Sequence, residues 1–331
     1  MKISYIHFAK VILFCMAMVL FNACDLESDE TTKKEENHNN NRPTEPEQLV
    51  EIKDGAIMAA FSVSETEKVY FSVGNLQYQA STQTWRFAEN QWDYVGTQTE
   101  DAYLGAAGGT VEGSDNANIS KTYNGWIDLF GWATSGWEGG VDSCQPYSTS
   151  YYQTSYVLGG STSNNMTGEY ANADWGVYNA VSNGGNKAGM WRTLSQAEWN
   201  YLLFERQNAD SLCSSGVVNG VKGLIILPDG WEKPWYVLFK PHNPDWCSSE
   251  YNYYSIYEWA DLQATGAVFL PVTGKRDRTA VQRAGDACYY WSSTAADYNA
   301  VGLYVFSDEI ITQYTFGRSS GLAVRLVQDV K

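Results

Sequence analysis

The sequence predicts an α+β fold with many short strands, few helices and long loops. Runs of β-branched and aromatic residues bounded by Gly, Pro or Asn recur from residue 68 onward, as is typical of strands packed in a sheet. Only two segments have helical spacing. Residues 136–185 are rich in Ser, Thr, Asn, Gly and Tyr without clear periodicity, which predicts long surface loops ordered by packing around their rings.

The first 23 residues have the features of a secretory signal peptide. Two lysines flank the start, and an unbroken apolar run of eleven residues follows at positions 11–21. A membrane-spanning helix needs about 20 such residues. A positive start, a short apolar core and a small residue before a break are typical of a secretory signal. We therefore expect removal of residues 1–23.

Cys24 directly follows the small residue Ala23. This arrangement resembles the lipobox of bacterial lipoproteins, in which the thiol carries the lipid, although Phe21 stands where such boxes usually have Leu. The resemblance implies a lipid on Cys24 that attaches the chain to the outer membrane. The alternative is a plain signal peptide in which Cys24 is incidental.

Residues 24–50 are predicted to be a flexible acidic tether. The stretch from Asp25 to Gln48 has no aromatic and almost no aliphatic residue, so it cannot bury enough apolar surface to become ordered. The acids behind Cys24 resemble the tag that sends Bacteroidetes lipoproteins to the cell surface, and the alternative is a solvated spacer. These acids are Asp25, Glu27, Asp29 and Glu30.

Residues 51–331 are expected to form a single domain, because their length suits one large domain and no internal repeat is present. The full sequence has a formal net charge of −16 and no basic cluster. An acidic chain repels the phosphates of nucleic acids. Nucleic acid is therefore excluded as a partner.

Several strands can be placed individually. The run "KVYFSVGNLQYQ" at residues 68–79, followed by "STQTWRFAE", predicts a hairpin. Asn219-Gly220 between apolar arms is the strongest short hairpin signal. Residues 266–274 form a short apolar strand that ends at its Pro and Gly, and three more strands are expected at 301–306, 310–316 and 322–327.

Two helices are expected. Ser195 and Glu198 form a capping box, and the helix that they begin has a buried face at helical spacing. Residues 256–263 would form a second, short helix. The buried face of the first helix comprises Trp199, Leu202, Leu203 and Arg206.

The stretch "ACYYWSSTAADYNAVGLYVF" should contribute two strands. Residues 289–293 would enter the sheet with Trp291 in the core, residues 294–300 would form a loop, and residues 302–306 the next strand. Alternation places Leu303 and Val305 on one face of this strand, and Tyr304 and Phe306 on the other.

The sequence offers few candidate catalytic residues. "GRSSG" at residues 317–321 matches a nucleophile elbow, but a strand follows it and no His lies downstream, which favours a turn. His242 lies five residues before Cys247 across a Pro, which favours a loop over a Cys–His pair. Glu258 and Asp261 could be the two carboxylates of a glycoside hydrolase. We expect no enzyme, no catalytic residue and no cofactor.

Four cysteines remain after Cys15 and Cys24 are set aside, and they contain no Cys-x-x-Cys motif of a zinc site. In an exported protein they allow two disulfides in three pairings, and four reduced, buried thiols are the alternative. The four are Cys144, Cys213, Cys247 and Cys288.

Three stretches together resemble a known group of domains. "MWRTLSQAEWNYLL" is similar to the Arg-Leu-Pro-Thr-x-x-Glu-Trp segment of formylglycine-generating-enzyme-like (sulfatase-modifying-factor) proteins. "CYYWSSTAADYNAVGLYVF" resembles the Tyr-Trp-Ser-Ser segment of C-type-lectin-like domains in Bacteroidetes and Fibrobacter surface proteins, including Fibrobacter major paralogous domains. "GLAVRLV" resembles their closing Val-Arg strand. The resemblance spans most of residues 69–327.

The resemblance implies a C-type-lectin-like fold with a mixed, twisted sheet, few helices and long loops. It does not imply the enzyme, whose C-terminal cysteines are represented here only by Cys288. The Glu-Pro-Asn and Trp-Asn-Asp signatures of sugar-holding calcium lectins are missing. Calcium is compatible with the family, but the sequence names no metal ligand.

In related variable proteins the last hairpins form the ligand-facing surface. The resemblance therefore implies that a glycan or protein ligand is bound there, and the alternative is a plain β surface. Two other functions stay open: a structural or adhesion component whose aromatics are core, and the carboxylate-dependent hydrolase. The implied contacts are Tyr298, Asn299, Tyr304, Tyr314 and Arg318.

Overall fold

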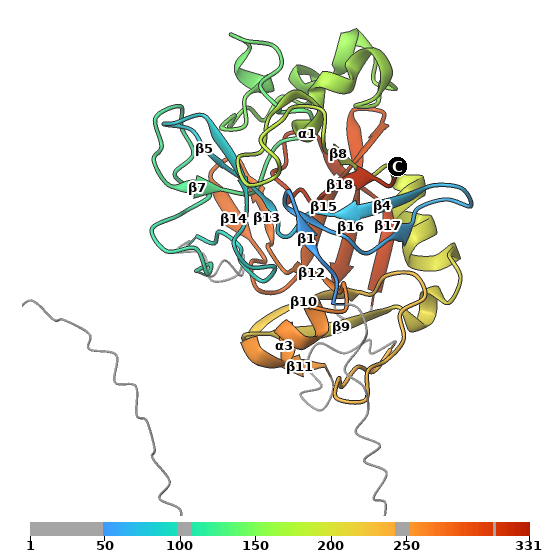
Figure 1. The fold of residues 1–331 in the computed structure, drawn as a ribbon. Coiled ribbons are helices and arrows are strands. Elements are labelled where there is room, and N and C mark those ends of the chain that lie inside the picture. The colour runs from blue at the N-terminus through green and yellow to red at the C-terminus, as the bar shows by residue number, and fades with distance from the viewer. Residues whose placement is uncertain (1–48, 98–107, 242–251, 307–308) are drawn as a thin grey trace, which may run out of the picture. The chain divides into compact units, whose positions relative to one another are not determined.

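The computed structural model describes residues 49–97, 108–241, 252–306 and 309–331, and in them short strands form six small sheets (Figure 1). These described residues pack as one unit. No helix in the described ranges is long and apolar enough to cross a membrane. The expected signal peptide and Cys24, and the tether as far as residue 48, lie outside the described residues.

One four-stranded sheet joins the two ends of the described chain. Its order is β3-β4-β18-β8 and every pairing is antiparallel. The last strand begins at Leu326, later than the expected strand at residues 322–327, because residues 322 and 323 make only isolated bridges. The strands are β3 (Phe61–Ser62), β4 (Lys68–Phe71), β8 (Arg192–Thr193) and β18 (Leu326–Asp329).

The C-terminal hairpins form a three-stranded antiparallel sheet of β15 (Cys288–Ala296), β16 (Asn299–Phe306) and β17 (Glu309–Gly317). Leu303 and Val305 are buried, whereas Tyr304 and Phe306 are partly exposed, which confirms the predicted alternation.

The loop expected at residues 294–300 is wrong. Past a bulge, Ala295 pairs with Ala300 and Ala296 with Asn299. Only Asp297 and Tyr298 separate the two strands. Asp297 has a φ of 53°, a left-handed conformation that short hairpin turns require and that Asp adopts more readily than most residues.

A second four-stranded sheet, β11-β9-β10-β12, is mixed because β11 (Tyr253–Tyr254) runs parallel to β9 (Cys213–Val218). The predicted Asn219-Gly220 hairpin connects β9 to β10 (Val221–Ile226), and both residues have positive φ, as a type I′ turn requires. The expected strand at residues 266–274 is β12 (Val268–Pro271).

The predicted N-terminal hairpin is present as β5 (Leu76–Gln79) and β6 (Thr84–Phe87). β7 (Trp126–Ile127) pairs with the other edge of β5. Two small hairpins complete the sheets, namely β1 (Ile52–Lys53) with β2 (Ala56–Ile57), and β13 (Lys275–Asp277) with β14 (Ala280–Gln282).

Both predicted helices are confirmed. α2 (Gln196–Asn200) continues into the π-helical turn η6 (Tyr201–Glu205), and α3 spans Ile256–Gln263. Each begins with a complete capping box. The described residues also contain α1 (Trp175–Tyr178) and the 3-10 turns η2 (Asp142–Cys144), η3 (Gln153–Tyr156), η4 (Leu158–Gly160), η5 (Gly168–Ala173) and η7 (Ala209–Ser211).

Indole rings dominate the core. Trp291 is buried as predicted, and its indole N–H donates to the carbonyl of Phe130 at 2.7 Å. A partner of this kind is what a buried Trp needs. Six tryptophans in the described part of the chain are fully buried: Trp132, Trp175, Trp191, Trp199, Trp259 and Trp291.

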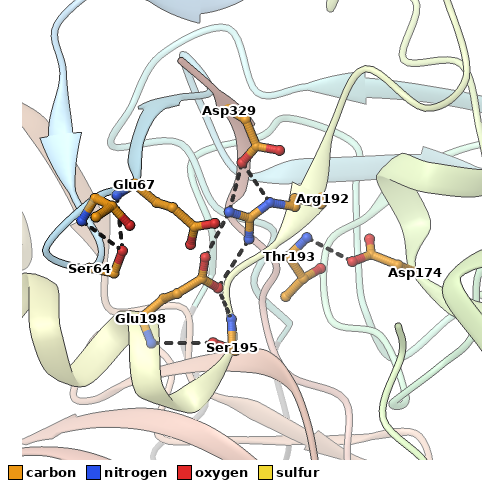
Figure 2. A network of polar contacts seen from close by, with 9 residues as sticks. Ser64, Glu67, Asp174, Arg192, Thr193, Ser195, Glu198 and Asp329 are labelled. Atoms are coloured by element: carbon orange, nitrogen blue, oxygen red, sulfur yellow. Dashed lines mark hydrogen bonds and ion pairs between the residues drawn. The ribbon is translucent and has the colours of Figure 1, made fainter. Parts of the chain in front are cut away.

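Arg192 joins β8, α2 and the last strand through carboxylates (Figure 2). Its guanidinium forms a two-point pair with Glu198 at 2.7 and 3.0 Å and contacts Asp329 at 2.7 Å. Glu198 also accepts the backbone N–H of Ser195 at 2.6 Å. One carboxylate thus closes the capping box and fixes the helix to the sheet.

Ser195→Ala is expected to lower the free energy of unfolding by about 1 kcal/mol, the usual cost of losing an N-cap hydroxyl. Chemical denaturation measures this change. Ser211→Ala, which removes an exposed hydroxyl, is the control and should have no effect. Equal stability of the two variants would contradict a stabilising role for the capping box.

Candidate functional site

The sequence-predicted contacts fall into three different places. Tyr304 and Tyr314 lie on one face of the β15–β16–β17 sheet, with their ring centroids 5.2 Å apart. Tyr298 and Asn299 are exposed at the β15–β16 turn. Arg318 is buried.

The rings on the sheet continue from the core to the surface. Tyr289 and Phe316 are buried and lie 5.2 and 4.8 Å from Tyr304 and Tyr314, respectively. Tyr314 is 46% exposed, and Tyr304 stacks on Phe306 at 6.3 Å. We call the outer rings of Tyr304, Phe306 and Tyr314 the sheet platform. The guanidinium of Arg283 lies over this platform, 4.0 Å from the ring of Phe306.

Arg318 was predicted to contact a surface ligand, but it is buried. Its side chain donates to the carbonyls of Asn299 at 3.0 Å, Tyr156 at 3.1 Å, Thr162 at 2.6 Å and Asp297 at 2.7 Å. Its guanidinium also lies 4.4 Å from the centre of the Trp132 ring. Arg318 therefore cross-links loops from inside and does not reach a surface ligand.

A groove of about 930 Å³ is lined by residues that do not include those of the sheet platform. This volume is typical of small-ligand sites. Its wall comes from the β5–β6 hairpin, residues 119–121, residues 135–150 and the end of α1. We call it the loop groove. Its aromatic members are Tyr78, Trp85, Tyr147 and Tyr178.

The chemistry of the loop groove is aromatic and neutral. Lys121 and Asp142 are the only charged side chains among its lining residues, and they balance each other. Burial, and next the neighbouring Tyr147, raises the pKa of Tyr78 to about 12. Burial and the charge of Asp142 also raise the pKa of Tyr147. Both phenols therefore stay protonated and can donate and accept hydrogen bonds at neutral pH.

Short hydrogen bonds hold the wall of the groove. The Ser135 hydroxyl donates to the carbonyl of Asn172 at 2.6 Å, and the amide of Asn179 donates to the carbonyl of Ser135 at 2.9 Å. The hydroxyls of Ser148 and Tyr156 lie 3.0 Å apart, and Tyr156 donates to the carbonyl of Ser150 at 2.8 Å. Because Arg318 binds the carbonyl of Tyr156, the buried guanidinium is linked to this wall.

The other candidate catalytic residues, Glu258, Asp261 and Ser319, do not line the loop groove. Glu258 accepts from the N–H and hydroxyl of Ser255 as a helix cap, and both Glu258 and Asp261 are exposed on α3. The Ser319 hydroxyl accepts from the side-chain amide of Gln153 at 2.6 Å in the predicted turn. Within the described ranges, His, Cys, Asp and Glu side chains form no metal-holding group.

The thiols of Cys144, Cys213 and Cys288 are free, so the alternative of two disulfides within the chain is wrong. Burial raises the pKa of Cys213 to about 12 and that of Cys144 to about 11, with a further contribution at Cys144 from Glu138. Protonated thiols are poor nucleophiles. His242 and Cys247 lie outside the described residues.

Sequence reasoning missed the loop groove. The available signal was the Tyr-, Ser- and Asn-rich composition of residues 136–185, which supplies Tyr147 and Tyr178. The partners Tyr78 and Trp85 come from a distant hairpin, and only the folded chain brings them to the same hollow. Comparisons with family models, curated proteins and solved structures find no match to this chain.

Proposed function

We propose that this chain is a non-catalytic, lipid-anchored protein of the outer cell surface that binds an extracellular glycan in the loop groove. The observation that carries the proposal is the groove itself, in which four aromatic residues and many neutral polar groups surround about 930 Å³ with balanced charge. The lipid on Cys24 and the surface location are part of the proposal and rest on the sequence.

A glycan suits this lining better than a charged metabolite. Sugars present apolar C–H faces that stack on rings and hydroxyls that bond with amides and phenols. Tyr, Ser, Gly and Asn offer rigid ring area and adaptable hydrogen bonding at modest entropic cost. Hydrolysis by paired carboxylates is disfavoured, because the lining holds one carboxylate, Asp142, and such hydrolysis needs two.

The finer fold assignment is also proposed: a C-type-lectin-like domain of the formylglycine-generating type. Support comes from three structural features of the stretches that carry the resemblance. The capping-box helix packs Trp199 into the core, β15 buries Trp291, and β18 closes a sheet with β4. A lectin-like shape does not by itself imply sugar binding, so the ligand is argued from the groove.

Tyr178→Ala is expected to weaken glycan binding tenfold or more, since truncating an aromatic hot-spot residue costs about 2 kcal/mol and about 1.4 kcal/mol is already tenfold in affinity. The chain from Cys24 onward, with Cys24→Ser, would be screened on a glycan array. The best ligand would then be titrated calorimetrically. Tyr178 is 42% exposed, so its truncation should not affect folding, and Tyr178→Phe should retain most of the affinity.

Tyr314→Ala is the matched control, because Tyr314 is similarly exposed but lies on the sheet platform. It should leave the affinity unchanged. The groove assignment fails if Tyr314→Ala weakens binding and Tyr178→Ala does not. Absence of any glycan bound at millimolar concentration would overturn the proposed function and favour a structural or protein-binding role.

A further inference from the structure

Exposed apolar side chains concentrate around α3. Half of the large apolar residues that are exposed in the described part of the chain, seven of fourteen, belong to three neighbouring segments. Single exposed apolar residues are ordinary, but a group of large ones marks an interaction surface. The seven are Leu49, Ile52, Trp235, Leu238, Tyr253, Ile256 and Tyr257.

Three hydrogen bonds show that these segments are neighbours. The N–H of Val50 donates to the carbonyl of Ala264, just after α3, at 2.8 Å. The indole N–H of Trp231 donates to the hydroxyl of Thr265 at 2.8 Å. The hydroxyl of Tyr254 donates to the carbonyl of Leu238 at 2.6 Å. The N-terminal segment, residues 231–240 and the β11–α3 segment therefore lie next to one another.

The exposure in this region is unusually high. Trp235, Leu238 and Tyr257 are 75, 79 and 79% exposed. The side chains next to Leu238 point inward, since Val237 and Phe239 are buried. The chain thus turns large apolar groups outward from a segment that is anchored in the core. We call these seven exposed residues the α3 face. They are Leu49, Ile52, Trp235, Leu238, Tyr253, Ile256 and Tyr257.

We propose that the α3 face contacts the surface of a lipid bilayer. The first described residue, Leu49, is part of this face, and residues 1–48, with the proposed lipid site at Cys24, precede it. The tether that carries the proposed lipid therefore joins the folded unit at this face, so this face is the one closest along the chain to the anchor. Trp and Tyr are the residues that prefer the membrane–water interface, where an apolar ring meets polar headgroups.

The inference rests on the lipid-anchor part of the proposed function but not on glycan binding. It predicts that the folded chain has membrane affinity of its own, because apolar area placed in the interface contributes to binding independently of an acyl chain. The loop groove is built from other residues, so it would remain available to a ligand while the α3 face is in contact with lipid.

The test uses the chain from Cys24 onward with Cys24→Ser, which carries no lipid, and phosphatidylcholine vesicles. We expect measurable partitioning at millimolar lipid. The triple variant Trp235→Ser, Leu238→Ser, Tyr257→Ser should lower the partition coefficient at least tenfold. A matched triple variant at exposed rings elsewhere, Tyr151→Ser, Tyr152→Ser, Phe204→Ser, should leave it unchanged.

Hydrogen exchange of the unsubstituted chain gives a second readout that needs no variant. Vesicles should slow exchange in residues 231–240 and 253–260 and leave the loop groove unaffected. Absence of partitioning, or equal partitioning of both triple variants, would overturn the proposal. So would self-association that the first triple variant abolishes without any vesicle binding. Glycan titration of the same variants separates failure of this proposal from failure of the proposed function. If the α3 face does not bind lipid, the variants should still bind glycan in the loop groove.

Discussion

Arg318→Met is expected to lower the free energy of unfolding by about 3 kcal/mol, because several buried carbonyl acceptors lose their charged donor at once. The substitution keeps the length of the side chain but removes donors to four backbone carbonyls. A buried acceptor left without a donor costs about 1–3 kcal/mol. Because Arg318 is linked to the groove wall through Tyr156, Arg318→Met should also weaken glycan binding. Chemical denaturation measures the first effect and calorimetry the second.

Burial lowers the pKa of Arg318 to about 10, so the guanidinium stays charged at neutral pH. Arg318→Lys should therefore keep the charge but recover only part of the stability, because one ammonium group cannot reach four carbonyls spread around a planar fork. Arg283→Met is the control: its guanidinium lies over the ring of Phe306 and pairs with Asp286 near the surface. A loss no larger for Arg318→Met than for Arg283→Met would contradict the structural role.

Stability is expected to fall as the pH rises from about 4 to 7. Asp128 is fully buried, and desolvation raises the pKa of its carboxyl to about 7 against the hydrogen bonds from Asn116 and Val95. An unfolded Asp titrates at about 3.9. Between these two pKa values the folded state binds the proton more tightly than the unfolded state does. The contribution of Asp128 to stability is therefore complete below about pH 4 and is lost as the pH rises through about 7. Moving from pH 7 to pH 5 should add about 2–3 kcal/mol.

Asp174 acts in the same direction, because burial raises its pKa to about 6. Asp229 has a lowered pKa. The stability that depends on its ionised form is therefore lost only below about pH 4, outside the range from about pH 4 to 7. Thermal unfolding between pH 4.5 and 8 measures the slope. Asp128→Asn should flatten the slope, and a carbon-13 titration of the Asp128 carboxyl tests it without any variant. A carboxyl that titrates below pH 5 in the folded chain would disprove this account.

Local sequence signals located the elements that depend on local physics. The capping box at Ser195, the Asn219-Gly220 turn and the alternation around Tyr304 all appear as expected. Each depends on neighbours within a few residues, so the pattern contains the information needed. The loop expected before β16 was wrong because cross-strand pairing past a bulge extends both strands, and no local pattern encodes that pairing.

The sequence by itself determined an α+β chain rich in strands, the two capped helices and the burial of Trp291, together with an acidic and aromatic composition. Only the tertiary structure decided that Arg318 points inward and that Tyr78 and Tyr178 line the same hollow. Periodicity specifies which face of an element a side chain occupies. Long-range packing decides whether that face meets solvent, a carbonyl or another ring, because it depends on segments far apart in the chain.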